Sequence, residues 1–360
     1  MKQMKLYMPT LVYSEKDCVK NHSKELASLG TKALIVTGRH SSRVNGSLDA
    51  AMAALSEHGV PYVVFDEIEE NPSVETVMKA RELGLEEQVD FVLGIGGGSP
   101  MDACKAIALM ITNPQADESI LYQSVELPCM PVAAIPTTAG TGSEVTPYAI
   151  LTLHRERTKR SISHKIFPKL ALMDPTYLKT ASRSCLVNTA VDALSHLVES
   201  YLNTNANSLN HIYSGKGLAI WSEIKEQLLN NQLTDADYEK LMNASMLGGM
   251  AIAHTGTSLP HGMSYAITYE LGIPHGKAVG IFLSGYVACY KNQEDAEQVL
   301  KLLGFQSAEE FTQYLKTLLG DVCIDPDLLK RDVEDLLANQ AKLANYPFEI
   351  SFEELYHLKQ

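Results

Sequence analysis

The stretch Phe91-Val-Leu-Gly-Ile-Gly-Gly-Gly-Ser-Pro-Met-Asp102 joins a short apolar run to a glycine-rich turn and then to residues typical of a helix start. Glycines let the backbone approach a pyrophosphate closely, and the N–H groups of a helix N-terminus attract an anion. We expect Ser99 to be the N-cap, Pro100 the first helical residue and Asp102 part of a capping box. The turn lacks the G-x-G-x-x-G spacing, so a strand–helix turn that binds nothing is the alternative.

On either side of this stretch, apolar runs at 32–37, 62–65 and 131–135 alternate with helix-like segments such as 47–58 and 73–84. Strands that alternate with helices indicate βαβ units and a parallel sheet. Beyond Ser182 the pattern changes to long helical segments with few β-branched runs: 186–203, 208–230, 235–254, 293–303, 308–319 and 326–344. We predict an α/β dinucleotide-binding domain over 1–180 and an all-α metal- and substrate-binding domain over 181–360, with an active-site cleft between them.

Two further loops follow predicted strands. The hydroxyl and N–H groups of 136–144 are suited to lining the same nucleotide, with a polar turn as the alternative. At the end of the first strand, an acidic residue usually binds the ribose 2′-OH and would repel a 2′-phosphate. This sequence has Gly38 there, with Ser41, Ser42 and Arg43 nearby, which favours NADP over NAD; an exposed basic loop is the alternative.

The composition excludes several classes of protein. The chain has 360 residues, 45% of them hydrophobic, and a formal net charge of −13, whereas nucleic-acid binding needs a basic face. Six scattered cysteines form no C-x-x-C pair, so neither a disulfide framework nor a thiolate zinc site is indicated. No signal-peptide run and no apolar stretch of about 20 residues is present, which argues against a membrane partner. We therefore expect a cytoplasmic protein.

A candidate metal site comes from four residues. Asp192 and His196 are four residues apart in a helix-like segment, so both side chains share one helix face. His261 and His275 each stand in a Pro-His-Gly sequence, beside a turn or helix end. Three imidazoles and one carboxylate suit Fe(II) or Zn(II). Taken alone, Asp192 and His196 are more typical of a hydrogen bond on a helix face than of a metal site.

In this order the motifs resemble those of the iron-containing (group III) alcohol dehydrogenase family, within the dehydroquinate synthase-like superfamily. The resemblance covers nearly the whole chain and is strongest to the short bacterial alcohol and 1,3-propanediol dehydrogenases. The matching segments are Gly94 to Asp102, Pro136 to Thr146, Asp174-Pro175, Val191 to His196, and the pair His261 and His275.

The resemblance implies a Rossmann-like N-terminal domain and a helical C-terminal domain. It implies that the metal ligands are Asp192, His196, His261 and His275. It also implies dinucleotide contacts from Gly96, Gly97, Gly98, Ser99, Asp102, Thr137, Thr138 and Thr141. Lys159 is the candidate for the family's cofactor-contacting lysine, with a surface lysine as the alternative. Family members with glycine at the position of Gly38 tend to use NADP.

The sequence departs from the family at one point near the metal ligands. Many members carry a second histidine, a proposed proton carrier, a few residues after the equivalent of His261, where this chain has Tyr265. Proton release must then use Tyr265, His254, water or the nucleotide ribose.

We therefore predict a metal-dependent dehydrogenase that transfers hydride between a primary alcohol or diol and a nicotinamide cofactor, NADP rather than NAD. Fe²⁺ is the expected metal and Zn²⁺ the alternative. The competing functions are a glycerol-dehydrogenase-like polyol oxidoreductase, a lyase acting on a sugar phosphate, and a nucleotide-binding protein without activity. The lyase is disfavoured because the helical half shows no lysine or arginine cluster beside the histidines. The resemblance also implies a homodimer.

Overall fold

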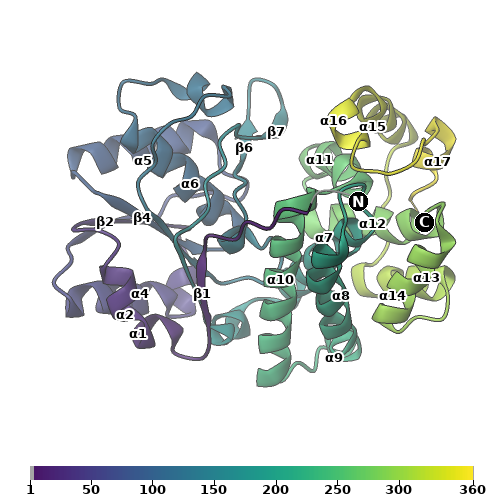
Figure 1. The fold of residues 1–360 in the computed structure, drawn as a ribbon, viewed down its shortest axis with the longest axis horizontal. Coiled ribbons are helices and arrows are strands. Elements are labelled where there is room, and N and C mark those ends of the chain that lie inside the picture. Colours follow the sequence, from purple (N-terminus) through teal and green to yellow (C-terminus); the bar gives the residue numbers. More distant parts are fainter. Residues whose placement is uncertain (1–3, 360) are drawn as a thin grey trace. The chain divides into compact units, whose positions relative to one another are not determined.

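The computed structural model describes residues 4–359, which form two compact units (Figure 1). The α/β unit comprises residues 8–182, and the helical unit comprises residues 183–359 together with residues 4–7. The first unit thus ends at Ser182 rather than at residue 180, and residues 4–7 belong to the second unit, not the first. The reason is contact: the Tyr7 N–H donates to His254 Nε2 at 3.2 Å, and the Ser208 hydroxyl to Met4 Sδ at 3.4 Å.

A six-stranded sheet in which all neighbouring strands run parallel is the framework of the α/β unit. In spatial order its strands are β1 (Leu11–Ser14), β8 (Leu170–Met173), β5 (Val132–Pro136), β4 (Phe91–Gly96), β2 (Ala33–Thr37) and β3 (Tyr62–Phe65). A separate antiparallel hairpin consists of β6 (Ile150–Leu153) and β7 (Thr158–Ser161). The predicted parallel sheet is confirmed, and its four predicted strands are β2, β3, β4 and β5.

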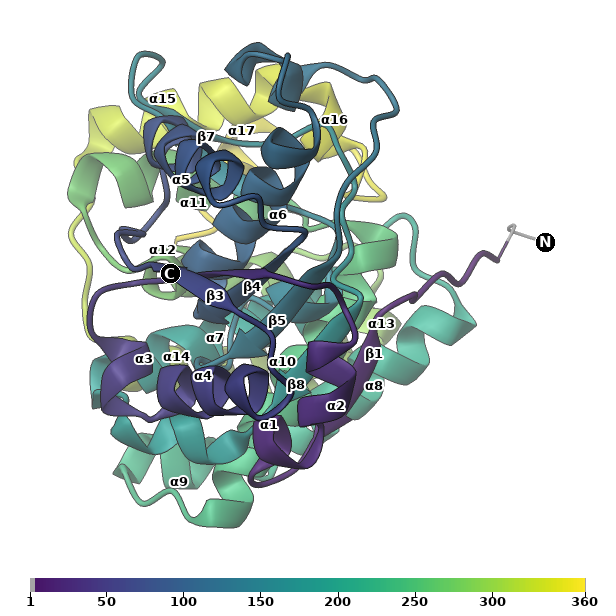
Figure 2. The same cartoon turned by 90° about the vertical axis from the view of Figure 1, so that its left-hand side faces the viewer.

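Helices cover both faces of this sheet (Figures 1 and 2). They are α1 (Cys18–Asn21), α2 (Ser23–Ala27), α3 (Ser41–Val44), α4 (Ser47–Glu57), α5 (Val74–Glu86) and α6 (Gly98–Thr112). Side chains alternate along a strand, so Ile35 and Leu93 pack with α4 on one face, while Leu34 and Val92 pack with α5 and α6 on the other. Burial on both faces explains the nearly continuous apolar character of β2 and β4.

The strand order brings three loops to one edge of the sheet. Because β4 lies between β2 and β5, the loops that follow these three strands are neighbours at the carboxyl ends. The Thr137 N–H donates to the Gly96 carbonyl at 2.8 Å, which ties two of these loops together. The chain order reverses between β2 and β4, and at such a reversal α/β sheets commonly bind nucleotides. The fold therefore gathers the glycine-rich turn and both predicted nucleotide loops.

The start of α6 differs from the prediction. Gly97 is the N-cap and the helix begins at Gly98, so Ser99 already lies within its first turn. The Ser99 hydroxyl accepts a hydrogen bond from the Asn71 N–H at 3.0 Å instead of capping the helix. Asp102 forms no capping box, because its carboxylate accepts hydrogen bonds from the Ser143 hydroxyl and the Ile150 N–H. Long-range partners thus replace the local ones that the sequence suggested.

The helical unit contains eleven α-helices and no strand within residues 183–359. They are α7 (Arg183–Tyr201), α8 (Ser208–Ser222), α9 (Lys225–Asn230), α10 (Asp235–Thr255), α11 (Leu259–Leu271), α12 (His275–Ala288), α13 (Gln293–Leu303), α14 (Ala308–Leu319), α15 (Pro326–Ala338), α16 (Gln340–Leu343) and α17 (Phe352–Tyr356). The all-helical prediction is confirmed. Within the described residues, no helix has both the length and the apolarity needed to cross a membrane.

The most deeply enclosed helix of this unit is α7, which is buried along most of its length and packs against α8, α10 and α12. Close approach of α12 depends on glycine: a Cβ atom built on Gly276 would lie 1.8 Å from the Asn188 carbonyl oxygen of α7. Gly276 directly follows His275, so this contact also sets the position of the first turn of α12.

We expect Gly276→Ala to lower the free energy of unfolding by about 2 kcal/mol or more, because the new methyl group forces α12 away from α7. Gly215→Ala is the matched control, since a Cβ there meets only ordinary contacts at 3.7 and 3.8 Å. That change should leave stability equal or raise it by up to about 1 kcal/mol through helix propensity. Thermal unfolding of both variants measures the difference, and equal midpoints would contradict the tight α7–α12 contact.

Candidate functional site

Three helices of the helical unit supply the predicted metal ligands. Asp192 and His196 lie one turn apart on the buried face of α7. His261 lies in the first turn of α11, directly after Pro260, and His275 is the first residue of α12, directly after Pro274. Each Pro-His-Gly sequence therefore begins a helix. Proline suits such a start because the N–H group it lacks would have no partner within the helix.

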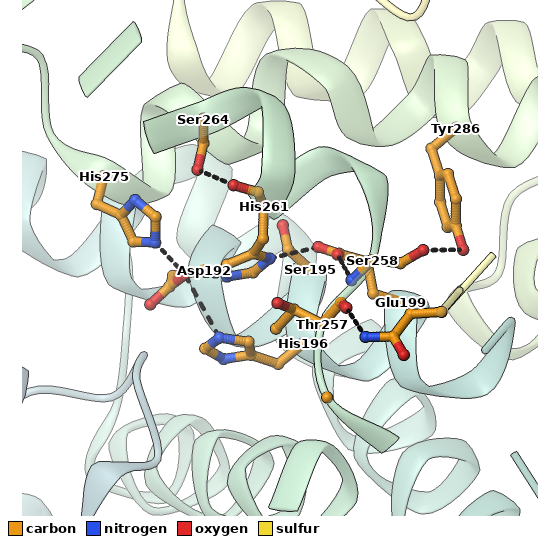
Figure 3. A network of polar contacts seen from close by, with 12 residues as sticks. Asp192, Ser195, His196, Glu199, Thr257, Ser258, His261, Ser264, His275 and Tyr286 are labelled. Carbon is orange, nitrogen blue, oxygen red and sulfur yellow. Dashed lines mark hydrogen bonds and ion pairs between the residues drawn. The ribbon is translucent and has the colours of Figure 1, made fainter. Parts of the chain in front are cut away.

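The three imidazoles converge on one carboxylate oxygen (Figure 3). Asp192 Oδ1 lies 3.4 Å from His261 Nε2, 3.8 Å from His275 Nε2 and 3.9 Å from His196 Nε2. Asp192, His261 and His275 each offer one ligand atom, and these atoms lie within 4.8 Å of one another. His196 falls outside that tighter group, but its ring stacks on His261 with centroids 4.6 Å apart.

Burial and charge at this cluster suit a cation. Asp192 and His261 are 3% and 2% exposed, and neither Asp192 Oδ1 nor His261 Nε2 forms a hydrogen bond. Burial alone would raise the pKa of the Asp192 carboxyl, but the neighbouring imidazoles outweigh it and hold that pKa well below its usual range. Burial would lower the pKa of His261, yet the carboxylates of Glu199 and Asp192 raise it to about 10. One carboxylate and three imidazoles form a donor set that fits Fe²⁺ or Zn²⁺.

Glu199 is a residue of this site that the sequence analysis missed. It is fully buried, and its two carboxylate oxygens accept hydrogen bonds from His261 Nδ1–H and from the Ser258 N–H, each at 2.5 Å. The bond to Nδ1 directs Nε2 of the same ring toward Asp192. Its signal was present in the sequence, because Asp192, His196 and Glu199 follow the i, i+4, i+7 spacing of a single helix face.

The two candidate proton carriers occupy different surroundings. The Tyr265 ring is stacked on the ring of His275, with centroids 5.9 Å apart and planes 11° apart. His254 uses both ring nitrogens elsewhere: Nδ1–H donates to the Met250 carbonyl at 2.8 Å, and Nε2 accepts from the Tyr7 N–H. Of the two, the structure brings only Tyr265 into contact with a candidate ligand.

The glycine-rich turn lies in the α/β unit and is shaped by its neighbours. Gly96 has φ +147°, a conformation that favours glycine, and a Cβ there would collide with Pro100. A Cβ on Gly97 or Gly98 would crowd the side chains of Thr138 or Thr141, respectively. Those two threonines therefore lie directly beside the N-terminus of α6, as the nucleotide prediction requires.

A buried lysine, which the sequence analysis also missed, secures this arrangement. The Lys105 ammonium donates to the Ser143 hydroxyl and to the Tyr148 carbonyl, both at 2.7 Å, and lies 3.9 Å from Asp102 Oδ1. Asp102 thus has a partner for its charge within the protein. Asp102, one of the predicted cofactor residues, lies in α6 beside the glycine-rich turn. Its hydrogen bonds join α6 to the segment after β5.

Lys159 reaches the same region from the β6–β7 hairpin. Its ammonium donates to Asn71 Oδ1 at 2.6 Å, and the Asn71 N–H donates to Ser99 Oγ. Asn71 has a left-handed backbone, with φ +60°. Lys159 is therefore linked through one residue to the first turn of α6, although these residues are far apart in sequence.

The segment after β2, which includes the short helix α3, carries the other four predicted cofactor residues. A Cβ on Gly38 would lie 3.3 Å from the Ile68 carbonyl oxygen, so the position is tight. Ser42 is buried, with its hydroxyl 2.8 Å from that of Thr37, whereas Ser41 is exposed. The half-exposed Arg43 forms an ion pair with Asp66 at 2.8 Å.

Known proteins resemble this chain over both units. Residues 9–175 match the family described as iron-containing alcohol dehydrogenase, and residues 186–350 match the C-terminal part of the Fe-containing alcohol dehydrogenase family. A solved iron-containing alcohol dehydrogenase from Thermotoga maritima is 37% identical with a TM-score of 0.91, covering 98% of each chain. Alcohol dehydrogenase 4 of Schizosaccharomyces pombe is 29% identical, covering 91% of this chain and 80% of its own length. The 1,3-propanediol dehydrogenase of Citrobacter freundii is 30% identical, and the match covers 76% of this chain and 72% of that protein. The chain therefore belongs to the iron-containing alcohol dehydrogenase family, as an oxidoreductase that acts on CH–OH groups with a divalent metal and a nicotinamide cofactor.

Proposed function

We propose that this protein interconverts a primary alcohol or diol and the corresponding aldehyde, using iron held by Asp192, His196, His261 and His275, and NADP(H) in preference to NAD(H). The observation that carries the metal assignment is the convergence of three Nε2 atoms on Asp192 Oδ1, an oxygen that forms no hydrogen bond. Family membership makes a nucleotide-binding protein without activity the weaker alternative.

When bound, the metal would polarise the substrate oxygen as a Lewis acid, and the cofactor would carry the hydride. The chain's own residues prepare the site for this chemistry. Asp192 supplies the negative charge, and Glu199 fixes the orientation of the His261 ring. His275 is the most open of the four candidate ligands, with 28% of its side chain exposed. This opening favours the side of the cluster near His275 for substrate entry.

Tyr265 is our candidate for passing the alcohol proton toward solvent. Its ring contacts His275, and a phenol can both donate and accept a hydrogen bond. His254 is the weaker candidate, because transferring a proton there would require breaking its bond to Met250 or to Tyr7.

We expect His261→Ala to abolish metal binding and turnover together, because it removes one Nε2 ligand and leaves Glu199 buried beside an apolar methyl group. Elemental analysis of the purified protein and an aldehyde-dependent NADPH assay measure both effects. His357→Ala is the matched control, since that side chain is 75% exposed and far in sequence from the ligands. Full turnover by a metal-free His261→Ala protein would disprove the metal assignment.

Glu199→Gln should weaken metal binding by about 10- to 100-fold, the usual effect of removing a group that orients a ligand. Glutamine offers one acceptor oxygen where two N–H donors need one each, so either His261 or Ser258 loses its partner. Titration of the metal-free protein with Zn²⁺ against a chromophoric chelator gives the affinity without relying on activity. The exposed Glu353→Gln is the control, and equal affinities would show that Glu199 has no orienting role.

The proposed preference for NADP rests on Gly38 and on the short helix α3, which follow β2. No carboxylate occupies the Gly38 position, and Arg43 uses one N–H group on Asp66 while its side chain is 52% exposed. The remaining guanidinium N–H groups are suited to a 2′-phosphate. The adjacent Ser41 is exposed and supplies a further donor.

Arg43→Ala should therefore raise the KM for NADPH by about 10-fold or more, the usual effect of losing a hydrogen bond to a charged group. The KM for NADH should change little, because NADH lacks the 2′-phosphate. Steady-state kinetics with both cofactors measure the ratio, with the exposed Arg155→Ala in the β6–β7 turn as the control. An equal effect on both cofactors would contradict the proposed NADP preference.

The homodimer implied by the resemblance stays a prediction. The strand β1 lies at one edge of the sheet and pairs with β8 on one side. Its other side is where we expect the subunit contact.

A further inference from the structure

A cation from the C-terminal region lies beside the candidate metal ligands. The Lys342 ammonium of α16 is 5.4 Å from the centroid of the Tyr265 ring, and Tyr265 in turn is stacked on His275. All three residues belong to the helical unit. Lys342 therefore brings a positive charge close to the side of the cluster that carries its most exposed ligand.

The hydrogen bond of the Lys342 ammonium holds it against the segment that directly precedes α11, the helix that carries His261. The ammonium donates to the Thr257 hydroxyl at 2.8 Å, and Thr257 directly precedes Ser258, whose N–H is held by Glu199 (Figure 3). The Asn345 amide donates to the Thr257 carbonyl at 2.7 Å, which fixes this part of the chain. Lys342 and Thr257 thus form a donor pair whose backbone is held in position.

What this ammonium lacks is a counter-ion. Within residues 4–359, Lys342 forms no ion pair with a carboxylate, although the chain as a whole has an excess of acidic groups. Glu199, the carboxylate that holds the neighbouring Ser258, already accepts hydrogen bonds from His261 and Ser258. A half-buried ammonium that is bonded only to a neutral hydroxyl is suited to binding an anion from outside the chain.

We propose that Lys342, together with the Thr257 hydroxyl, binds the anionic end of the substrate, so that the preferred substrates are short aldehydes or alcohols carrying a carboxylate or sulfonate. This inference rests on the proposed function, because it assigns a substrate class to the same metal centre. The reacting carbon–oxygen group lies at the metal ligands, and the acid group lies at Lys342. Hydride transfer itself is unchanged.

The test compares two four-carbon aldehydes, butanal and succinic semialdehyde, which differ in whether the far end carries a carboxylate. The wild-type kcat/KM should be about 10-fold or more higher for succinic semialdehyde. Lys342→Gln should lower the ratio of kcat/KM for succinic semialdehyde to kcat/KM for butanal by about 10-fold or more. Lys342→Arg keeps the charge and should retain the preference. The exposed Lys330→Gln is the matched control.

Two results would overturn the inference while leaving the proposed function intact. One is equal kcat/KM for both aldehydes in the wild type, with no selective loss in Lys342→Gln. The other is an unchanged substrate ratio combined with a raised KM for NADPH, which would show that Lys342 binds a cofactor phosphate instead. Metal content is measured in each variant, because a loss of metal would lower kcat/KM equally for both substrates.

If neither aldehyde is turned over by any of the proteins, the kinetics give no substrate ratio, and binding decides the inference separately. Calorimetry with 4-hydroxybutanoate on the metal-loaded protein should then show affinity that falls by about 10-fold or more in Lys342→Gln. Equal affinity in both proteins, or no binding by the wild type, would overturn the anion site.

Discussion

Asp192 is a carboxylate enclosed by the most deeply buried helix of its unit, where water cannot solvate it. Removing such a group from water costs several kcal/mol unless opposite charge and hydrogen bonds compensate. The compensation comes from three imidazoles on three different helices, all with Nε2 within 4 Å of one carboxylate oxygen. The packing of α11 and α12 against α7 is therefore tied to the electrostatics of this residue, and a divalent cation would complete the same balance of charge.

That balance of charge depends on the positions of His261 and His275 at the starts of α11 and α12. His261 and His275 each follow a proline in a first helical turn, so small shifts of α11 or α12 would move a ligand directly. Two contacts limit such shifts: the close approach of Gly276 to the Asn188 carbonyl, and the hydrogen bonds that Glu199 accepts from the start of α11. Steric fit and buried hydrogen bonding thus act on the same atoms, and neither alone would hold the three rings together.

The sequence predicted features that depend on residues close together in the chain better than features that depend on residues far apart in it. The parallel sheet and the helical second unit were predicted, because alternation and helical periodicity are local patterns. Strand β1, at one edge of the sheet, and strand β8 beside it were not predicted. The cap assigned to Ser99 was wrong because Asn71, 28 residues earlier, engages its hydroxyl. Glu199 shares a helix face with Asp192 and His196, but the partner that gives it a role, His261, is 62 residues away.

The two units differ in how their sites are encoded. In the α/β unit, the proposed nucleotide recognition depends on backbone N–H groups at the start of α6, which belong to one contiguous glycine-rich stretch. In the helical unit, the proposed metal and substrate contacts come from side chains of α7, α11, α12 and α16, and no single stretch contains them. Lys342 is 85 residues from Thr257 and 67 or more residues from each candidate ligand in the sequence, so its position near them is visible only in the fold. The candidate metal ligands can therefore be recognised in the sequence, whereas the proposed substrate-selecting contact between Lys342 and Thr257 is visible only in the three-dimensional structure.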